Sequence, residues 1–397
     1  MKLSTTAAFR LQASITVALL AGSIAPTPLY PHYQAAWAFS TITTTLVFGV
    51  YSAAVLAALL TTGRLSDHIG RRPVLIASTL LSALAMGVLG TAGGEAALYA
   101  GRLLQGVATG AAVSAVGAGL VDLDRTRGPV ANALAPISGT GLGALFAGLV
   151  IHYLPYPTHL VYALLGAVFV AQAVGVAFLP ERIATMPGAL ASLRPRLALP
   201  ASVYAPMRVA LPVLIAAWAL AGFYASLGPA LVQSVFDFDA SLFGGVALFA
   251  MAGSGAVAVL VLMSRGTRTM LAAGATGLVV GATIVLVALA TRAPGLFFGG
   301  TAVAGMGFGA SFQGAIRSAL PLAAAHERAG VLSVIFVVAY ASMALPSLGA
   351  GIAVAADTSL VRTAEGFSAF VFVLAAIAVF AIATPRRSIA ACVGEQP

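Results

Sequence analysis

The chain has 397 residues, of which 60% are hydrophobic and only 8% are charged, and its formal net charge is +9. A soluble protein carries about 25% charged residues, so this composition excludes a water-soluble globular fold and indicates a protein that contacts the lipid bilayer. The basic residues lie in short segments between apolar runs and form no single basic surface, which argues against a nucleic-acid partner.

Apolar runs long enough to cross a bilayer, about 20 residues each, predict an all-α membrane protein with twelve transmembrane helices. The first six runs lie at 12–32, 41–62, 73–91, 96–120, 129–151 and 159–179. The other six lie at 207–234, 242–263, 269–290, 295–319, 329–354 and 364–384. The apolar first run is too long for a signal peptide, so we expect it to be retained as a helix.

The positions of the basic residues predict the orientation in the membrane. With the N-terminus inside, all of the 20 basic residues except Arg102, Arg292 and Arg362 lie in cytoplasmic segments. Cytoplasmic loops of membrane proteins carry such an excess of Lys and Arg. We therefore expect both termini in the cytoplasm, and a bacterial inner membrane as the location.

The longest break between apolar runs divides the spans six and six. It is rich in arginine and proline, which predicts an N-terminal bundle at 1–180, a cytoplasmic linker at 181–206, and a C-terminal bundle at 207–397 with a short cytoplasmic tail. The pair Gly106 and Gly110 in the fourth span recurs as Gly305 and Gly309 in the tenth. The repeat supports two pseudo-symmetric six-helix bundles with a site between them near the midplane.

The most specific motif is the loop at 63–73, between the second and third spans. Gly63 and Gly70 would let a short loop turn sharply, and Arg71 and Arg72 fit the cytoplasmic charge bias. The alternative is a generic basic loop. The spacing of its glycines, leucine, aspartate and basic residues resembles the signature loop of the major facilitator superfamily.

The resemblance implies a gate that holds the cytoplasmic side closed. In that gate Asp67 would dock on the start of the eleventh span, where a helix N-terminus attracts negative charge. Arg71 would pair with Asp122 at the end of the fourth span.

A second motif, Arg102-Leu-Leu-Gln105-Gly106, resembles an element of the same family in the fourth span. An unpaired charge within the hydrocarbon is expensive. One hypothesis is that Arg102 faces the central cavity and acts on substrate or on a proton site together with Gln105. The other is that its side chain extends to the outer membrane interface.

The fifth span contains a glycine-rich stretch that resembles an element of exporters in this family, although Ala144 stands where those exporters have proline. Small residues let helices approach closely. We expect helix packing at Gly106, Gly110, Gly139, Gly143 and Gly148.

No carboxylate or imidazole is predicted at mid-membrane, which disfavours a cationic substrate and favours a neutral or anionic one. If protons are coupled, the candidates are Asp122 inside and Asp237 or Asp239 outside. The family places the first, fourth, seventh and tenth spans around the cavity, and helix packing is the alternative role for each candidate. Candidate cavity residues are Pro26, Tyr30, Phe223, Tyr224, Gln313 and Tyr340.

These observations predict a secondary active transporter working by alternating access, with proton-coupled export of a drug-like compound or metabolite as the leading hypothesis. The alternative is an uptake symporter or facilitator for a neutral or anionic metabolite, and the remote alternative is a membrane sensor or a membrane-embedded transferase. The sequence has no phosphate-binding loop of the Gly-x-x-x-x-Gly-Lys-Ser/Thr type. We expect a monomer without enzymatic activity, cofactor or metal, whose partners are a small molecule and protons.

Overall fold

A computed structural model describes residues 2–181, 186–195, 197–324 and 327–384, and within these ranges every regular element is a helix. Twelve helices are long and apolar enough to cross a membrane. The predicted fold class is confirmed. The predicted tail beyond residue 384 lies outside the described residues.

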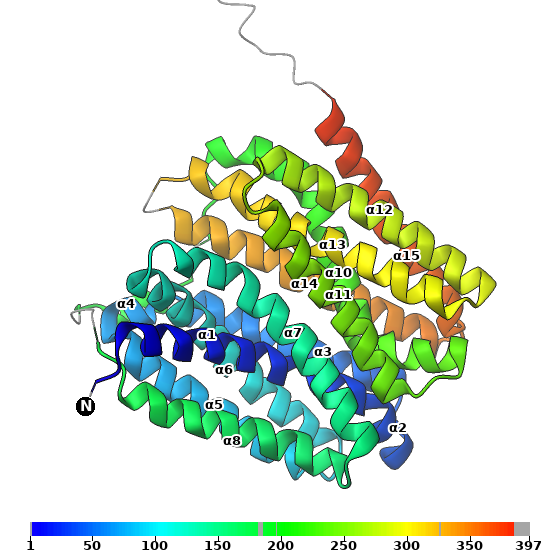
Figure 1. The fold of residues 1–397 in the computed structure, drawn as a ribbon, viewed down its shortest axis with the longest axis horizontal. Coiled ribbons are helices and arrows are strands. Elements are labelled where there is room, and N and C mark those ends of the chain that lie inside the picture. Colours follow the sequence, from blue (N-terminus) through cyan, green and yellow to red (C-terminus); the bar gives the residue numbers. More distant parts are fainter. Residues whose placement is uncertain (1, 182–185, 196, 325–326, 385–397) are drawn as a thin grey trace, which may run out of the picture.

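The first half of the chain forms the N-half, which occupies the lower left of Figure 1. Its elements are α1 (Thr5–Ile24), η1 (Thr27–Leu29), α2 (Tyr30–Trp37), α3 (Thr41–Thr62), α4 (Leu65–Ile69), α5 (Arg71–Gly90), α6 (Glu95–Leu123), α7 (Arg127–Tyr153) and α8 (Pro157–Ala177).

The second half forms the C-half, preceded by the short α9 (Ala189–Ser192). Its elements are α10 (Ala201–Phe236), α11 (Ala240–Leu262), α12 (Thr267–Thr291), α13 (Pro294–Ala319), η2 (Leu320–Leu322), α14 (Arg328–Ala355) and α15 (Leu360–Ala383). The first helix of this half begins at Ala201, six residues before the predicted start at 207, because the apolar run continues through Pro206 as helix.

The first span is interrupted at Pro26. Proline has no N–H, so Pro26 cannot bond the carbonyl of Gly22, four residues earlier. The helix α1 therefore ends at Ile24 and continues through η1 into α2. The break leaves backbone carbonyls of α1 free for other partners.

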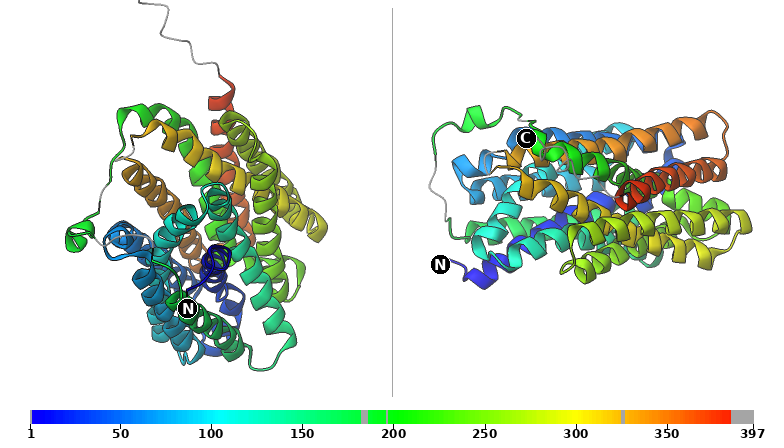
Figure 2. Two further views of the ribbon diagram at one scale, coloured as in Figure 1. Left: turned by 60° about the vertical axis from the view of Figure 1, so that its left-hand side comes forward. Right: turned by 90° about the horizontal axis from the view of Figure 1, so that it is seen from above.

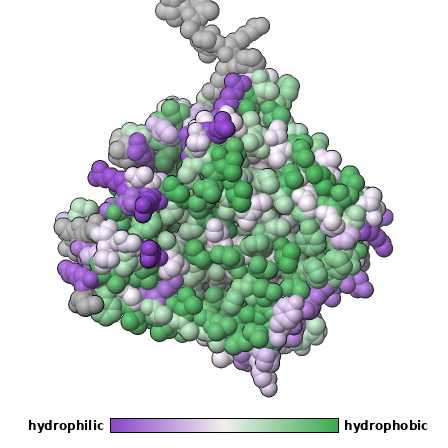
Figure 3. Space-filling model, viewed as in Figure 1, coloured by the Kyte–Doolittle hydropathy of each residue, from purple (hydrophilic) through white to green (hydrophobic). Residues whose placement is uncertain are grey.

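Each half has its own hydrophobic core, and the halves meet along two helix pairs, α7 with α11 and α3 with α14. Three residues of α3, Phe48, Tyr51 and Val55, belong to the core of the C-half. We call the end where α1 begins and the linker runs the linker end, and the other the opposite end (Figure 2). Figure 3 shows a broad apolar surface between two more polar ends, as a bilayer requires.

Close backbone contacts fix the packing inside and between the halves. A Cβ on Gly106 would lie 2.7 Å from the carbonyl oxygen of Tyr51, and one on Gly148 would lie 2.7 Å from that of Ser241. The other predicted packing glycines, Gly110, Gly139 and Gly143, also lie against the backbone of a neighbouring helix. Side chains at these positions would force the helices apart.

Candidate functional site

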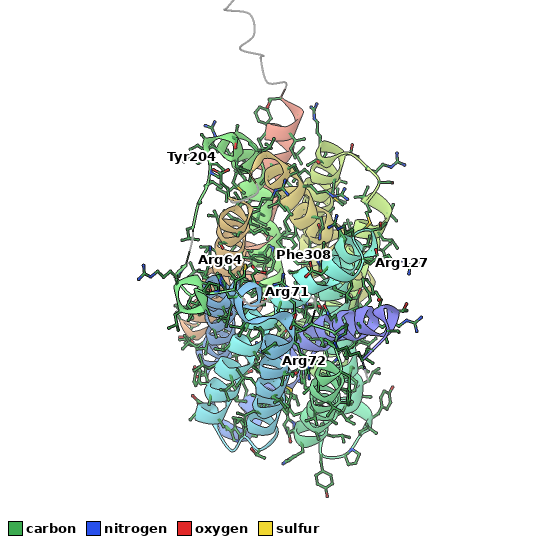
Figure 4. The ribbon with its side chains drawn as sticks, turned by 90° about the vertical axis from the view of Figure 1, so that its left-hand side faces the viewer. Arg64, Arg71, Arg72, Arg127, Tyr204 and Phe308 are labelled. Atoms are coloured by element: carbon green, nitrogen blue, oxygen red, sulfur yellow. The ribbon has the colours of Figure 1, made fainter. Side chains whose placement is uncertain are left out.

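The charged loop lies at the linker end of the N-half, where Figure 4 shows Arg64, Arg71, Arg72 and Arg127. Arg71 forms an ion pair with Asp67 one turn earlier, donates to the hydroxyl of Ser66 at 2.6 Å, and reaches the carboxylate of Asp122 at 3.4 Å. The backbone N–H of Arg72 donates to Glu181 at 2.9 Å. The loop therefore ties α4 and α5 to the end of α6 and to the chain after α8.

Two sequence expectations for this loop need correction. Gly63 has φ −57°, which any residue adopts, so only Gly70, with φ +96°, has the left-handed backbone that favours glycine. The carboxylate of Asp67 pairs with Arg71 instead of docking on the start of α14, because α4 packs against α5 and α9 in this structure.

Asp124 follows α6 and caps the start of α7. Backbone N–H groups of Arg127 and Thr126 donate to its carboxylate at 2.8 and 2.9 Å. These two bonds, with that of Arg127 the larger effect, lower the pKa of this carboxyl. The carboxylate thus stabilises the turn that joins two central helices of the N-half.

Arg102 is fully buried inside the N-half, at 0% exposure. It donates to the carbonyl of Ser23 at 2.6 Å and to the amide oxygen of Gln105 at 2.5 Å, and its guanidinium lies 4.1 Å from the ring centre of Tyr51. Gln105 in turn donates to the carbonyl of Gly22 at 2.7 Å. Extension of the Arg102 side chain to the outer membrane interface is therefore wrong for this structure. Its action on substrate or on a proton site stays a prediction.

These bonds have a local cause. The carbonyl of Gly22 has no helical donor because Pro26 stands four residues later, and Gln105 supplies that donor. Arg102 and Gln105 thus stabilise the break in the first span. The Nε and Nη2 atoms of Arg102 and the hydroxyl of Tyr30 remain buried without a hydrogen-bond partner among the described residues.

Five aromatic rings from three helices meet in the C-half, and we call them the aromatic cluster: Trp218 of α10, Phe308 and Phe312 of α13, and Phe336 and Tyr340 of α14. The ring centre of Trp218 lies 5.1 Å from that of Phe312, 5.3 Å from that of Tyr340 and 6.0 Å from that of Phe308. Phe336 lies 6.2 Å from Phe312. Seen from the linker end, Phe308 lies between the two halves (Figure 4).

Of the predicted cavity residues in the C-half, Tyr340 belongs to the aromatic cluster and the others do not. Phe223 packs on Phe367 at 4.6 Å, and the hydroxyl of Tyr224 lies 2.6 Å from that of Thr301, both inside the C-half core. Gln313 is partly exposed. Phe223 and Tyr224 thus pack between helices of the C-half in this structure.

Sequence reasoning missed four members of the cluster. The four are aromatic residues in the inner part of their spans: Trp218, Phe308, Phe312 and Phe336. A search of the sequence for aromatic residues at similar distances from the ends of different spans would have found them. The sequence expectation that the seventh and tenth spans line the centre identified α10 and α13. It did not identify the faces of these two helices that carry Trp218, Phe308 and Phe312.

Polar contacts between described residues of the two halves lie at the opposite end. The hydroxyl of Thr27 donates to the carbonyl of Ala225 at 2.7 Å, and that of Ser241 donates to the carbonyl of Pro28 at 3.0 Å. The ring of His152 at the end of α7 lies 3.7 Å from the carboxylate of Asp239 before α11. The opposite end is closed by these contacts.

No group of three or more His, Cys, Asp or Glu side chains comes together as metal ligands in the part of the chain that the structure describes. A family model described as Major Facilitator Superfamily matches residues 13–347. The chain belongs to this superfamily. A major facilitator chain is a multi-pass membrane transporter, which agrees with the twelve spans.

Among known proteins, this major facilitator chain is 34% identical over 99 residues to an MFS-type transporter, gkaD, of Penicillium citrinum. That match covers 24% of this chain and spans 17% of the relative's length. It therefore carries no activity of the relative to this chain.

Solved structures share the fold of this major facilitator chain. The POT family transporter PepTSo superposes with a TM-score of 0.73 at 10% identity, covering 94% of this chain and 97% of that one. The nucleoside transporter NupG (D323A mutant) gives 0.70 at 12%, covering 96% and 100%. A bacterial homologue of the human lysosomal transporter Spinster gives 0.69 at 11%, covering 94% and 96%. These likenesses concern the fold alone.

Proposed function

We propose that this major facilitator protein is a secondary active transporter that exports a small organic solute, a drug-like compound or metabolite, by alternating access coupled to protons. The main support is the asymmetry between its two ends. Polar contacts between the halves close the opposite end, while the gate loop at the linker end pairs within the N-half. A carrier caught with one end closed has this arrangement.

In this proposal the chain lies in a bacterial inner membrane with the linker end in the cytoplasm, since nearly all basic residues lie there. The N-half and the C-half, the latter from Ala201 onward, move as two bundles about the linker between them, and the protein works as a monomer. The gate residues are Gly63, Asp67, Gly70, Arg71, Arg72 and Asp122. The glycine-rich fifth span, which resembles that of exporters, favours export.

Proton coupling would involve carboxylates at the helix ends. Asp239 is the stronger outer candidate, because its partner His152 belongs to the other half, so a change of protonation alters a contact between the halves. Asp237 lies beside it without an ion pair in the described chain. Asp122, paired with Arg71, is the inner candidate.

Uptake or facilitated movement of a neutral or anionic metabolite is the second candidate. It is favoured by the positions of the carboxylates, which in the described chain all lie at or near helix ends. Exchange of protons through the midplane normally uses a buried acid. A facilitator needs none.

The test is expression in an efflux-deficient bacterium, with growth and everted-vesicle accumulation measured against a panel of toxic compounds. We expect resistance that Asp67→Asn and Asp239→Asn remove at equal membrane abundance, while the neighbouring Asp237→Asn retains it. Accumulation in everted vesicles should collapse when the pH gradient is dissipated. Sensitisation of the cells instead of resistance would contradict export and favour uptake. Accumulation that does not depend on the pH gradient would contradict proton coupling and favour a facilitator.

A further inference from the structure

The aromatic cluster lies at the depth where a carrier of this architecture binds its substrate. Trp218, Phe308 and Tyr340 each stand near the middle of a membrane-spanning helix, α10, α13 and α14. Four of the five rings are partly exposed, although they lie among buried neighbours. Partly exposed aromatic surface at mid-membrane is surface that a ligand can cover.

The cluster is in contact with the N-half through Tyr51. This residue of α3 belongs to the same hydrophobic core as Tyr340, and its ring carries the guanidinium of Arg102 on the side of the N-half. A molecule bound against Tyr340 would therefore touch a position at which the two halves meet.

One polar atom of the cluster is unused. The indole N–H of Trp218 is buried and has no hydrogen-bond acceptor among the described residues. A buried donor without an acceptor is destabilising, and native structures seldom retain one without a reason. An acceptor on a ligand stacked between the rings would satisfy it.

The cluster offers no charge. Each of the helices α10, α13 and α14 carries a single charged residue, Arg208, Arg317 and Arg328, and all three lie toward the linker end. Arg102 is fully buried and its guanidinium is held by the carbonyl of Ser23, by Gln105 and by the ring of Tyr51. A charged solute would lose its hydration here without gaining a counter-ion.

We infer that the aromatic cluster binds a neutral solute with a flat aromatic ring and a hydrogen-bond acceptor, which receives the indole N–H of Trp218. This inference rests on the proposed transport function and specifies the substrate class of that site. The rings supply stacking and the indole fixes orientation, so both parts of the solute contribute to its affinity.

The sequence provides a direct reporter, because it contains only two tryptophans, Trp37 and Trp218. Trp37 ends α2 and stacks on Tyr33 at 4.7 Å, away from the cluster. In a Trp37→Phe protein in lipid nanodiscs whose scaffold protein contains no tryptophan, the tryptophan emission comes from Trp218 alone. We expect saturable change of this emission with N-methylbenzamide and none with benzoate or benzylammonium.

Equilibrium dialysis against the same nanodiscs, with empty nanodiscs subtracted, separates the two recognition elements. Trp218→Phe keeps a ring and removes the donor, so it should weaken N-methylbenzamide binding by up to about tenfold and leave toluene binding unchanged. Phe312→Leu should weaken both probes by about threefold to tenfold. N-methylcyclohexanecarboxamide, which has the acceptor without the ring, should bind more weakly than N-methylbenzamide to the unsubstituted protein.

Equal binding of charged and neutral probes, or equal loss of toluene and amide in Trp218→Phe, would overturn the inference. Transport is measured separately in proteoliposomes. Binding without transport would reject the proposed function while the binding site stands. Transport of a charged solute, with no saturable signal from Trp218, would reject the inference while the transport function stands.

Discussion

Replacing Thr27 with valine should open the opposite end more often. The side chain is fully buried, and its hydroxyl donates to the carbonyl of Ala225 in the other half at 2.7 Å. That carbonyl has no helical donor, because the residue four positions later is Pro229. Valine has nearly the same shape, so the substitution removes the donor and leaves the carbonyl buried without a partner.

The magnitude follows from that unpaired carbonyl. A buried acceptor left without a donor costs about 1–3 kcal/mol, and here only the closed form bears the cost, since water reaches the carbonyl when the end opens. The ratio of open to closed molecules should therefore rise by about 5- to 150-fold.

The assay is labelling of a cysteine at Ser226, a residue 3% exposed that lines a small enclosed pocket with Tyr30 at the opposite end. In a Cys392→Ser, Ser226→Cys background, a membrane-impermeant maleimide added on that side reports opening. Thr27→Val should accelerate labelling within the stated range. Thr283→Val, which removes an exposed hydroxyl bonded within its own helix, is the matched control. Equal labelling rates in Thr27→Val and the control would refute the reasoning.

Three further changes test other contacts. Gly309→Ala should lower the thermal midpoint by several degrees, because its Cβ would collide with the backbone of α11, whereas Gly299→Ala, which meets nothing within 4 Å, should not. Gly70→Ala should destabilise the gate loop by about 1–3 kcal/mol, since alanine resists φ +96° and its Cβ would lie 2.6 Å from a linker carboxylate; limited proteolysis would show faster cleavage there, and unchanged cleavage would contradict this. Asp239→Asn should lower transport, because it removes the carboxylate that lies beside His152 in a contact between the halves; transport equal to that of the unsubstituted protein would rule out a role for this contact.

The fold could be predicted from the sequence because lipid imposes one dominant rule, the length of the apolar run. Twelve runs gave twelve helices. The rule failed locally at α10, where Pro206 and Arg208 suggested a linker and the chain is already helical from Ala201. Three prolines, Pro206, Pro212 and Pro229, lie inside α10, so a proline in this part of the chain does not mark the helix boundary.

The candidate site was less predictable, because it depends on which face of each helix turns inward. Arg102 could be identified as unusual, but its partners are backbone carbonyls, which have no sequence signature. Their availability follows from Pro26, four residues after Gly22. Trp218 was missed for a similar reason, since a ring in an apolar helix looks the same whether it packs in a core or faces the other half.

The setting of Arg102 also bears on how the chain enters the membrane during synthesis. An arginine costs about 2.5–3.5 kcal/mol on insertion at the centre of a span and less toward its ends, where Arg102 stands eighth of 29 residues. The groups that surround it, the carbonyl of Ser23 and the ring of Tyr51, belong to the first and second spans and are made before it. Gln105 follows within one turn. The fourth span thus meets its stabilising partners as it emerges, and a nascent chain without the first span should retain the fourth less efficiently.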